Sequence, residues 1–267
     1  MVLCREVAGV EVPIEHGAEV VCYPTPWHPH CRSRLSRLRE LGVTALISYG
    51  KHQVGEVKIV GKGHAAVVVL AKHQDHGLVA VKIRRMDSKR LSLEPEGELL
   101  KLAEETGFVP KVYAFDKDFV IREYVDGPTL KEYIEVANRC ELRKLFASIA
   151  RGFAKMDLMG VDVEEVSKPL TQIVVECGNP LAPKLVDLES ARRSQKASSL
   201  TRFLGFLARY VKGVPVYEIL GLGSSDFARI RELANRYKRA LGSEKREIAE
   251  EIARIIEFGG SDEHGCI

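Results

Sequence analysis

Two glycines followed by a lysine are the first pattern in the chain that could bind a phosphorylated ligand. Gly61 and Gly63 stand between two apolar segments that we expect to be strands, residues 57–60 and 65–71. Glycines let a backbone approach a ligand closely and leave amide groups free to face anionic oxygens, although the same pair also suits an ordinary hairpin turn. The next apolar segment ends near Lys82, whose ammonium either contacts phosphate or extends into solvent.

A carboxylate that could hold this lysine lies on the following segment. Apolar residues at helical spacing predict a helix over residues 95–106, ended by Gly107. Glu96 and Glu98 both lie in its first turn, and because they are two residues apart they face different directions. The pattern leaves open which of them points inward, and we take Glu96 as the candidate. A glycine turn, a lysine and a helix glutamate in this order predict a site for nucleotide phosphates.

These residues resemble, in type and order, those of the protein-kinase-like fold, and the resemblance extends over residues 57–191. The most similar group is the archaeal-type, atypical serine/threonine protein kinases, which are related to the RIO enzymes. The resemblance implies an α+β, bilobal fold with a β-rich N-lobe at 53–126, a helical C-lobe at 127–267 and an N-terminal extension at 1–52. It also implies that the chain binds ATP and Mg²⁺.

Two further segments look like motifs of that family. Residues 119–130 resemble the hinge, in which backbone groups of Glu123 to Val125 hold adenine. Residues 185–189, Leu-Val-Asp-Leu-Glu, occupy the place of the Asp-Phe-Gly motif. The resemblance therefore makes Asp187 a ligand of magnesium.

The catalytic loop departs from the family pattern. Matching residues 159–175 to the family's loop puts Glu165 at the catalytic carboxylate and Val163 at the usual histidine. The magnesium-binding asparagine would fall at Leu170, which leaves Gln172 as the nearest substitute. Glu165 could still orient the acceptor hydroxyl, because phosphoryl transfer depends mainly on positioning and electrostatics.

Alternatives remain open for this loop. Asp162, Glu164 and Glu165 could instead form a solvated acidic turn, and Lys168 is either close to the transferred phosphate or an ordinary surface lysine. If the loop is inactive, the chain is a nucleotide-binding pseudokinase that acts as a scaffold.

The segment after Asp187 bears on the acceptor. It reaches the next predicted helix, near residue 198, without room for the long activation segment of typical kinases. A folded protein, a small molecule or autophosphorylation would suit this shortened segment better than an extended peptide. We expect ATP-dependent phosphoryl transfer to a hydroxyl, first of all Ser or Thr of a protein. A small-molecule kinase of the aminoglycoside-phosphotransferase kind is the alternative.

The remaining elements follow from periodicity and turn residues. We expect a mainly helical second half with one small hairpin, behind a β-rich first half. Predicted strands lie at 18–23, 43–48, 77–83, 112–115, 119–124, 173–176 and 185–186, and predicted helices at 32–41, 130–136, 141–159, 198–211, 225–240 and 244–258.

Composition narrows the class of protein. The chain has 267 residues, 45% of them hydrophobic, and 40 Lys and Arg against 37 Asp and Glu, so it can form a sizeable core and has no strong overall field for nucleic acid. The six cysteines are dispersed along the chain, which predicts free thiols in a reducing, cytoplasmic environment. The N-terminus does not show the basic and then apolar pattern of a signal peptide, and we expect no membrane span because no apolar run is long enough. Only three Asn and four Gln are a sign of a thermophilic source.

Two local patterns have competing interpretations. Cys22, His28, His30 and Cys31 are possible zinc ligands, but their spacing is not a standard one and a packed loop is the simpler reading. The basic stretch 30–39 could face RNA or DNA, although such runs are more often solvated helix faces.

Overall fold

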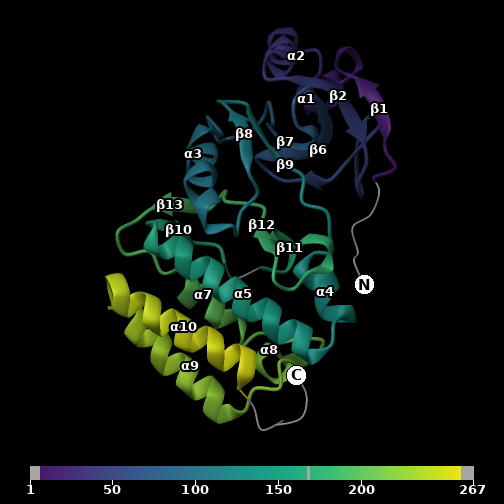
Figure 1. Cartoon of the computed structure of the whole chain (residues 1–267). Coiled ribbons are helices and arrows are strands. Elements are labelled where there is room, and N and C mark those ends of the chain that lie inside the picture. Colours follow the sequence, from purple (N-terminus) through teal and green to yellow (C-terminus); the bar gives the residue numbers. More distant parts are fainter. Residues whose placement is uncertain (1–6, 167–168, 260–267) are drawn as a thin grey trace. The chain divides into compact units, whose positions relative to one another are not determined.

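The computed structural model of the chain describes residues 7–166 and 169–259. These residues form two compact units. Residues 7–101 with Pro110–Tyr124 make up the first, which we name the sheet unit; Leu102–Val109 with the described residues from Val125 onward make up the second, the helical unit. The protein is a mixed α+β structure in which the strands of the described residues pair in antiparallel fashion (Figure 1).

A seven-stranded sheet forms the centre of the sheet unit. Its strands follow the order β1-β2-β6-β7-β9-β8, and β5 pairs with β6 outside this path. Residues 7–52 supply β1 and β2 to this sheet and belong to the sheet unit. The strands of the sheet are β1 (Val10–Pro13), β2 (Val43–Ser48), β5 (Gly61–Lys62), β6 (Ala66–His73), β7 (Gly77–Arg84), β8 (Val112–Phe115) and β9 (Phe119–Glu123), and β3 (His52–Val54) pairs with β4 (Val57–Ile59) in a hairpin beside them.

The two faces of this sheet differ. Side chains alternate along a strand, and on β7 Val79, Val81 and Ile83 point into the main apolar core of the unit. Two N-terminal helices, α1 (Ala18–Val21) and α2 (Cys31–Glu40), contribute buried residues to that same core. Lys82 therefore belongs to the opposite face of β7.

The predicted strand at 18–23 is wrong, because these residues form α1. Val20, Val21 and Cys22 are all fully buried. A continuous apolar run of this kind suits a buried strand or a buried helical turn equally well, so its β-branched residues were a misleading signal.

The helix after β7 follows the prediction. α3 (Glu94–Ala103) continues into a 3-10 turn (Glu104–Thr106) and ends at Gly107, whose φ is +70°. Within α3, Gly97 allows a close approach, because a Cβ there would lie 2.3 Å from the ring of Phe115.

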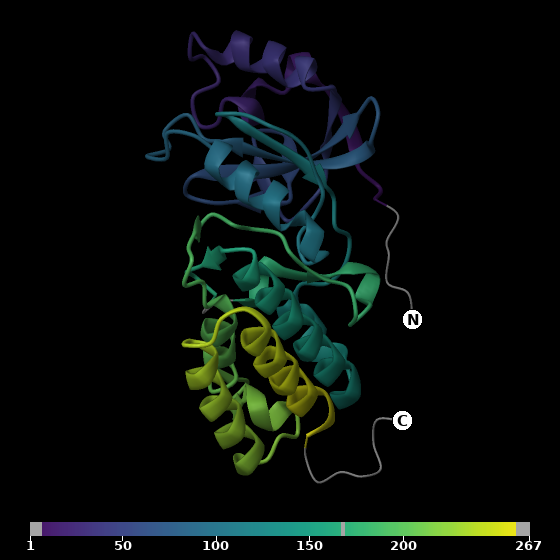
Figure 2. The ribbon, with the colours of Figure 1, turned by 60° about the vertical axis from the view of Figure 1, so that its left-hand side comes forward.

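The helical unit is built around one long central helix. α5 (Arg139–Leu158) packs against α10 (Gly242–Phe258) and α7 (Ser199–Phe206), and α10 packs against α9 (Ser224–Tyr237) (Figure 2). Aromatic side chains fill the space between them, with Phe146, Phe153, Phe203 and Tyr237 fully buried. The other elements are α4 (Leu130–Val136), α6 (Pro169–Gln172), α8 (Val216–Ile219), the 3-10 turn Glu176–Gly178 and the paired strands β10 (Val161–Val163) with β13 (Ala191–Arg193), β11 (Ile173–Val175) with β12 (Pro183–Leu185), and β14 (Tyr210–Val211) with β15 (Val214–Pro215).

Most predicted elements of this half are confirmed, with one shortened. The helix expected at 198–211 ends at Phe206, and Tyr210–Val211 begins a hairpin. Lys212 and Gly213 both have positive φ, 52° and 81°, which is the geometry of a tight hairpin turn. No helix among the described residues is long and apolar enough to cross a membrane.

Candidate functional site

Lys82 and Glu96 form a buried ion pair inside the sheet unit. The Lys82 ammonium lies 2.7 Å from Oε1 and 2.9 Å from Oε2 of Glu96, so both carboxylate oxygens accept from it. The two side chains are 8% and 1% exposed. Arg90 donates a further hydrogen bond to Glu96, at 3.0 Å. Glu98, the other candidate, is exposed, so the structure selects Glu96.

The glycine turn lies on the same sheet face as this lysine. Gly61 is opposite Val68, and Val68 is opposite Lys82. Residues directly opposite one another in antiparallel strands project to one face, and two strand spacings separate Gly61 from Lys82 by about 10 Å. A Cβ at Gly61 would meet only side-chain atoms of Val68, the nearest at 3.6 Å. Packing within the fold therefore does not require a glycine at position 61. The absence of a side chain there leaves space on the sheet face that contains Val68 and Lys82.

The tip of this hairpin, which we name the flap (Gly61 to Ala66), has its carbonyl and amide groups bonded unequally. Gly63 N–H donates to Ala66 O at 2.8 Å and closes a tight turn. The carbonyl oxygens of Gly63 and Ala65 both accept hydrogen bonds from Arg85, one from its guanidinium and one from its backbone N–H. The N–H groups of His64 and Ala65 have no acceptor among the described residues. Such adjacent unpaired donors are suited to anionic oxygens.

The predicted hinge residues differ in what their backbone can offer. Glu123 N–H already donates to Lys111 O at 2.8 Å, and Glu123 O accepts from Arg122 at 3.2 Å. Val125 is 6% exposed, and its N–H has no acceptor among the residues that the structure describes. An unpaired buried backbone donor is uncommon and points to an external acceptor. Val125 is thus the better of the two donors for a ligand.

Asp187 and Gln172 lie at one end of the β11–β12 hairpin in the helical unit. Ile173 is opposite Leu185 in this hairpin. The next residues outward, Gln172 and Val186, are also hydrogen-bonded, because Val186 N–H donates to Gln172 O at 2.9 Å. Asp187 Oδ1 accepts from Glu189 N–H at 3.0 Å. A carboxylate and an amide oxygen are the oxygen donors that Mg²⁺ uses alongside phosphate oxygens, so this donor set fits that ion.

Glu165 lies in an exposed turn beside the same segment. Its N–H donates to Ser190 Oγ at 3.0 Å, and the N–H of Glu164 donates to Ser190 O at 3.2 Å. The Glu164 side chain pairs with Arg192, at 3.0 Å. Val163, which the resemblance predicts at the position of a histidine, is buried and has no polar side chain. Among the described residues, Glu165 is therefore the exposed carboxylate of this turn without an ion pair.

Asp162 is not part of a solvated acidic turn, contrary to the alternative reading. It is 1% exposed, and its carboxylate accepts from Arg202 at 2.5 Å and from Ser198 N–H at 3.0 Å. Burial raises the pKa of Asp162, but the hydrogen bonds from Arg202 and Ser198 outweigh it and leave the pKa below its ordinary value. Asp162 holds the start of α7 against β10.

A second buried carboxylate supports this arrangement. Asp157 accepts from the N–H groups of Ser199 and Leu200, at 2.7 and 3.1 Å, and from the Tyr237 hydroxyl at 3.0 Å. Burial raises the pKa of Asp157 above its usual value despite these bonds. Ser199 Oγ in turn accepts from Val163 N–H at 2.8 Å. The turn that contains Glu165 is thus anchored to α7 and α5.

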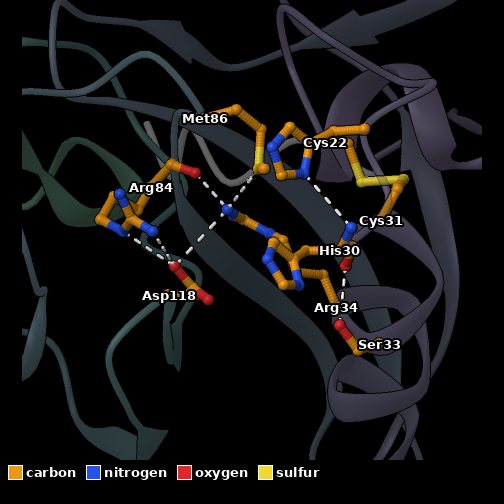
Figure 3. Close-up of a disulfide and its surroundings, with 9 residues drawn as sticks. Cys22, His30, Cys31, Ser33, Arg34, Arg84, Met86 and Asp118 are labelled. Carbon is orange, nitrogen blue, oxygen red and sulfur yellow. Dashed lines mark hydrogen bonds and ion pairs between the residues drawn. A yellow bond between two sulfur atoms is a disulfide. The ribbon is translucent and has the colours of Figure 1, made fainter.

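The zinc reading is not supported, and the expectation of reduced cysteines is wrong. Cys22 and Cys31 form a disulfide, which joins the loop after α1 to the first residue of α2 (Figure 3). Cys140 and Cys177 are disulfide-bonded as well. Two thiolates are therefore not available to a metal in this state. Cys4, Cys266 and Lys168, which the sequence analysis also considered, lie outside the described residues.

The basic stretch 30–39 is not a free cationic face. Arg34 is 4% exposed and lies against Asp118, at 3.5 Å. Arg37 pairs with Asp116 and Glu40, and Arg39 pairs with Glu15. Since three of its four arginines are engaged within the protein, the stretch offers little charge to nucleic acid.

A cavity of about 630 Å³ in the helical unit had no sequence signal. It lies between α5, α10 and the 3-10 turn before Gly107, next to Arg151, Lys155 and Arg246. None of the candidate site residues lines it.

The candidate residues thus form two groups, each within its own unit. Lys82, Glu96, Gly61, Gly63 and Glu123 belong to the sheet unit, and Val125, Glu165, Gln172 and Asp187 to the helical unit. No protein-family model matches the chain, and no curated protein is similar to it at a significant level.

Proposed function

We propose that the chain has the bilobal protein-kinase-like fold, with the sheet unit as N-lobe and the helical unit as C-lobe, and that it transfers phosphate from ATP to a hydroxyl. Ser or Thr of a protein is the proposed acceptor. The observation that supports this most is the buried pair of Lys82 and Glu96 on the same sheet face as Gly61.

A structural role explains this pair poorly. On the sheet face of Lys82, the residue two positions before it is Ala80, and Val120 of β9 lies directly opposite it; both are almost fully buried. Taking two charges out of water into such surroundings is expensive, and well-packed apolar residues would stabilise the sheet as well or better. Buried charges that are retained at such a cost are candidates for a functional site, where a ligand can use them.

The proposal gives each group a role in binding ATP. Lys82, oriented by Glu96, contacts the phosphates, and the flap N–H groups of His64 and Ala65 face their oxygens. Val125 N–H and the second lone pair of Glu123 O hold the adenine. Phosphoryl transfer then depends on positioning and on compensation of the phosphate charge.

Asp187 and Gln172 would hold magnesium, and Glu165 would meet the acceptor. Bound Mg²⁺ neutralises part of the charge on the phosphates. Glu165 is exposed and accepts or orients the proton of the acceptor hydroxyl. The chain between Asp187 and α7 is short and includes β13, which supports a folded protein or a small molecule as the acceptor.

One observation favours a second candidate, a nucleotide-binding pseudokinase. Val163 is buried at the position of the family's histidine, and an apolar residue, Leu170, stands where the resemblance expects asparagine. Neither side chain can bind a metal or a phosphate. Such a protein would bind ATP through Lys82 and the flap without turning it over.

Turnover of labelled ATP separates these possibilities. The chain, Lys82→Ala and Asp187→Ala are incubated with Mg²⁺ and γ-labelled ATP, and ATP binding is measured by calorimetry. Lys72→Ala, at an exposed lysine of the same sheet, is the matched control. We expect activity in the chain and the control and its loss in both site variants. Equal residual activity in all four would contradict the proposal. ATP binding without turnover would select the pseudokinase, and label on metabolites would select a small-molecule kinase.

A further inference from the structure

The flap is held from behind by the N-terminal segment. We infer that Tyr23 is a positioning residue of the nucleotide site, which fixes the flap from the face opposite Lys82 and so preorganises its amide groups for phosphate oxygens. This inference rests on the proposed function, and no catalytic motif includes Tyr23.

The ring of Tyr23 makes cation–π contacts with two side chains, and one of them, Lys62, belongs to the flap. The Lys62 ammonium lies 4.7 Å from the centre of the Tyr23 ring, and the Arg85 guanidinium lies 4.9 Å from it. Since side chains alternate along β5, Lys62 projects to the face opposite Gly61. The flap thus leaves the Lys82 side open at Gly61 and contacts the N-terminal segment through Lys62 on its other side. Cation–ring contacts within about 6 Å are attractive.

Arg85 connects Tyr23 to the tip of the flap. Its guanidinium donates to Gly63 O at 2.9 Å, and its backbone N–H donates to Ala65 O at 2.9 Å. Asp87 fixes the same guanidinium through two hydrogen bonds, at 2.8 and 2.7 Å. These bonds occupy the carbonyl oxygens of Gly63 and Ala65, whereas the N–H groups of His64 and Ala65 have no acceptor among the described residues and can face a ligand.

Tyr23 is itself held in place by the surrounding structure. Tyr23 O accepts from Met86 N–H at 2.8 Å, and the neighbouring Cys22 is fully buried and bonded to Cys31. Figure 3 shows that Arg34, from the same helix as Cys31, reaches the end of β7, where it donates to Met86 Sδ and Arg84 O. The loop that contains Tyr23 is therefore attached at both ends to the segment that contains Arg85.

A positioned flap strengthens binding of the phosphates and leaves binding of the nucleoside unchanged. The loss of both cation–ring contacts is expected to weaken ATP binding about 5-fold, or ~1 kcal/mol at 25 °C. Adenosine has no phosphate for the flap, so its affinity is expected to stay the same. A loss of folded protein would instead weaken both ligands by the same factor.

The test uses the full chain and three variants. Tyr23→Leu removes the ring, Tyr23→Phe keeps it, and Trp27→Leu changes an 80% exposed aromatic of the same loop as a matched control. Dissociation constants for Mg-ATP and for adenosine are measured by calorimetry. We expect a raised constant for ATP only, in Tyr23→Leu only. Equal constants in the chain and Tyr23→Leu, or an equal rise for both ligands, would overturn the inference.

A ligand-free measurement separates failure of this inference from failure of the proposed function. Gly63 N–H is hydrogen-bonded within the flap, so its hydrogen exchange reports flap order without any nucleotide. Tyr23→Leu is expected to speed this exchange several-fold, while exchange in the β3–β4 hairpin stays unchanged. Unchanged Gly63 exchange in that variant overturns the inference. Faster exchange in a chain that binds no ATP contradicts the proposed function and leaves the contact between Tyr23 and the flap as an observation about the fold.

Discussion

Replacing Lys82 alone, and then together with Glu96, separates a structural role of the pair from a role in ligand binding. In Lys82→Met, we expect Glu96 to stay buried and to keep its contact with Arg90, at 3.0 Å. Breaking a buried ion pair costs about 3–5 kcal/mol. Because the contact with Arg90 remains, we expect a loss of about 3 kcal/mol, which corresponds to a melting temperature roughly 6–12 °C lower if the whole chain unfolds as one cooperative unit.

Removing the second charge is expected to restore most of that stability. Lys82→Met with Glu96→Leu places apolar side chains of similar volume beside Ala80 and Val120, so we expect a stability within about 1 kcal/mol of the unchanged chain. ATP binding is expected to be lost in both variants, because the ammonium that contacts the phosphates is gone in each. Stability and binding therefore move independently if the pair serves a ligand.

Urea denaturation and calorimetry with Mg-ATP measure the two quantities. Lys72→Met, which breaks an exposed pair with Glu11 on the same sheet, is the control and is expected to change stability by less than about 1 kcal/mol. The reasoning is refuted if the double variant is no more stable than Lys82→Met, since the charges would then be needed by the fold. It is also refuted if the double variant binds ATP like the unchanged chain.

Three further predictions concern other parts of the structure. Gly61→Ala is expected to leave urea stability unchanged, because a Cβ there has room, and to weaken Mg-ATP binding several-fold in calorimetry; equal affinity would contradict the role of the flap. Asp162→Asn is expected to destabilise the chain at pH 7, and the difference should shrink as the pH falls below about 4: the lowered pKa of Asp162 means that its contribution is present at neutral pH and lost on protonation. A difference of the same size at pH 7 and pH 3 would show that this carboxylate is not the source. Cys22→Ser with Cys31→Ser is expected to cost about 2.5 kcal/mol in urea denaturation, from the unfolded-chain entropy that a cross-link at a sequence separation of 9 removes. Unchanged stability would show that the loop is ordered without the bond.

Local signals predicted the elements whose ends are set by nearby residues. The helix expected at 130–136 coincides with α4, which begins at a capping box formed by Thr129 and Glu132. The hairpin of β8 and β9 was predicted from a short polar turn, where Asp116 accepts hydrogen bonds from the next N–H groups. In both cases the information lies within a few residues.

Features that depend on distant contacts were not predicted. The pairing of β10 with β13 joins residues about thirty apart, and each strand alone is too short to show a pattern. The choice of Glu96 over Glu98 depends on how α3 packs, and the burial of Asp162 depends on Arg202 from α7. The disulfide of Cys22 and Cys31 could have been suspected from their proximity in sequence, but cysteine number and chain length pointed to free thiols.

The chain passes between its two units more than once, and this has a consequence for biosynthesis. Leu102–Val109 belongs to the helical unit although the sheet unit continues after it. Phe108 in this segment packs its ring edge-on against Phe153, 5.0 Å away, and accepts from Leu185 N–H at 2.7 Å. Phe153 and Leu185 are synthesised after Phe108. Phe108 therefore lacks both partners until α5 and the β11–β12 hairpin have been synthesised. A released fragment that ends at residue 124 would therefore contain every strand of the sheet but neither of these partners of Phe108, so we expect it to expose an apolar segment to which a folding chaperone can bind.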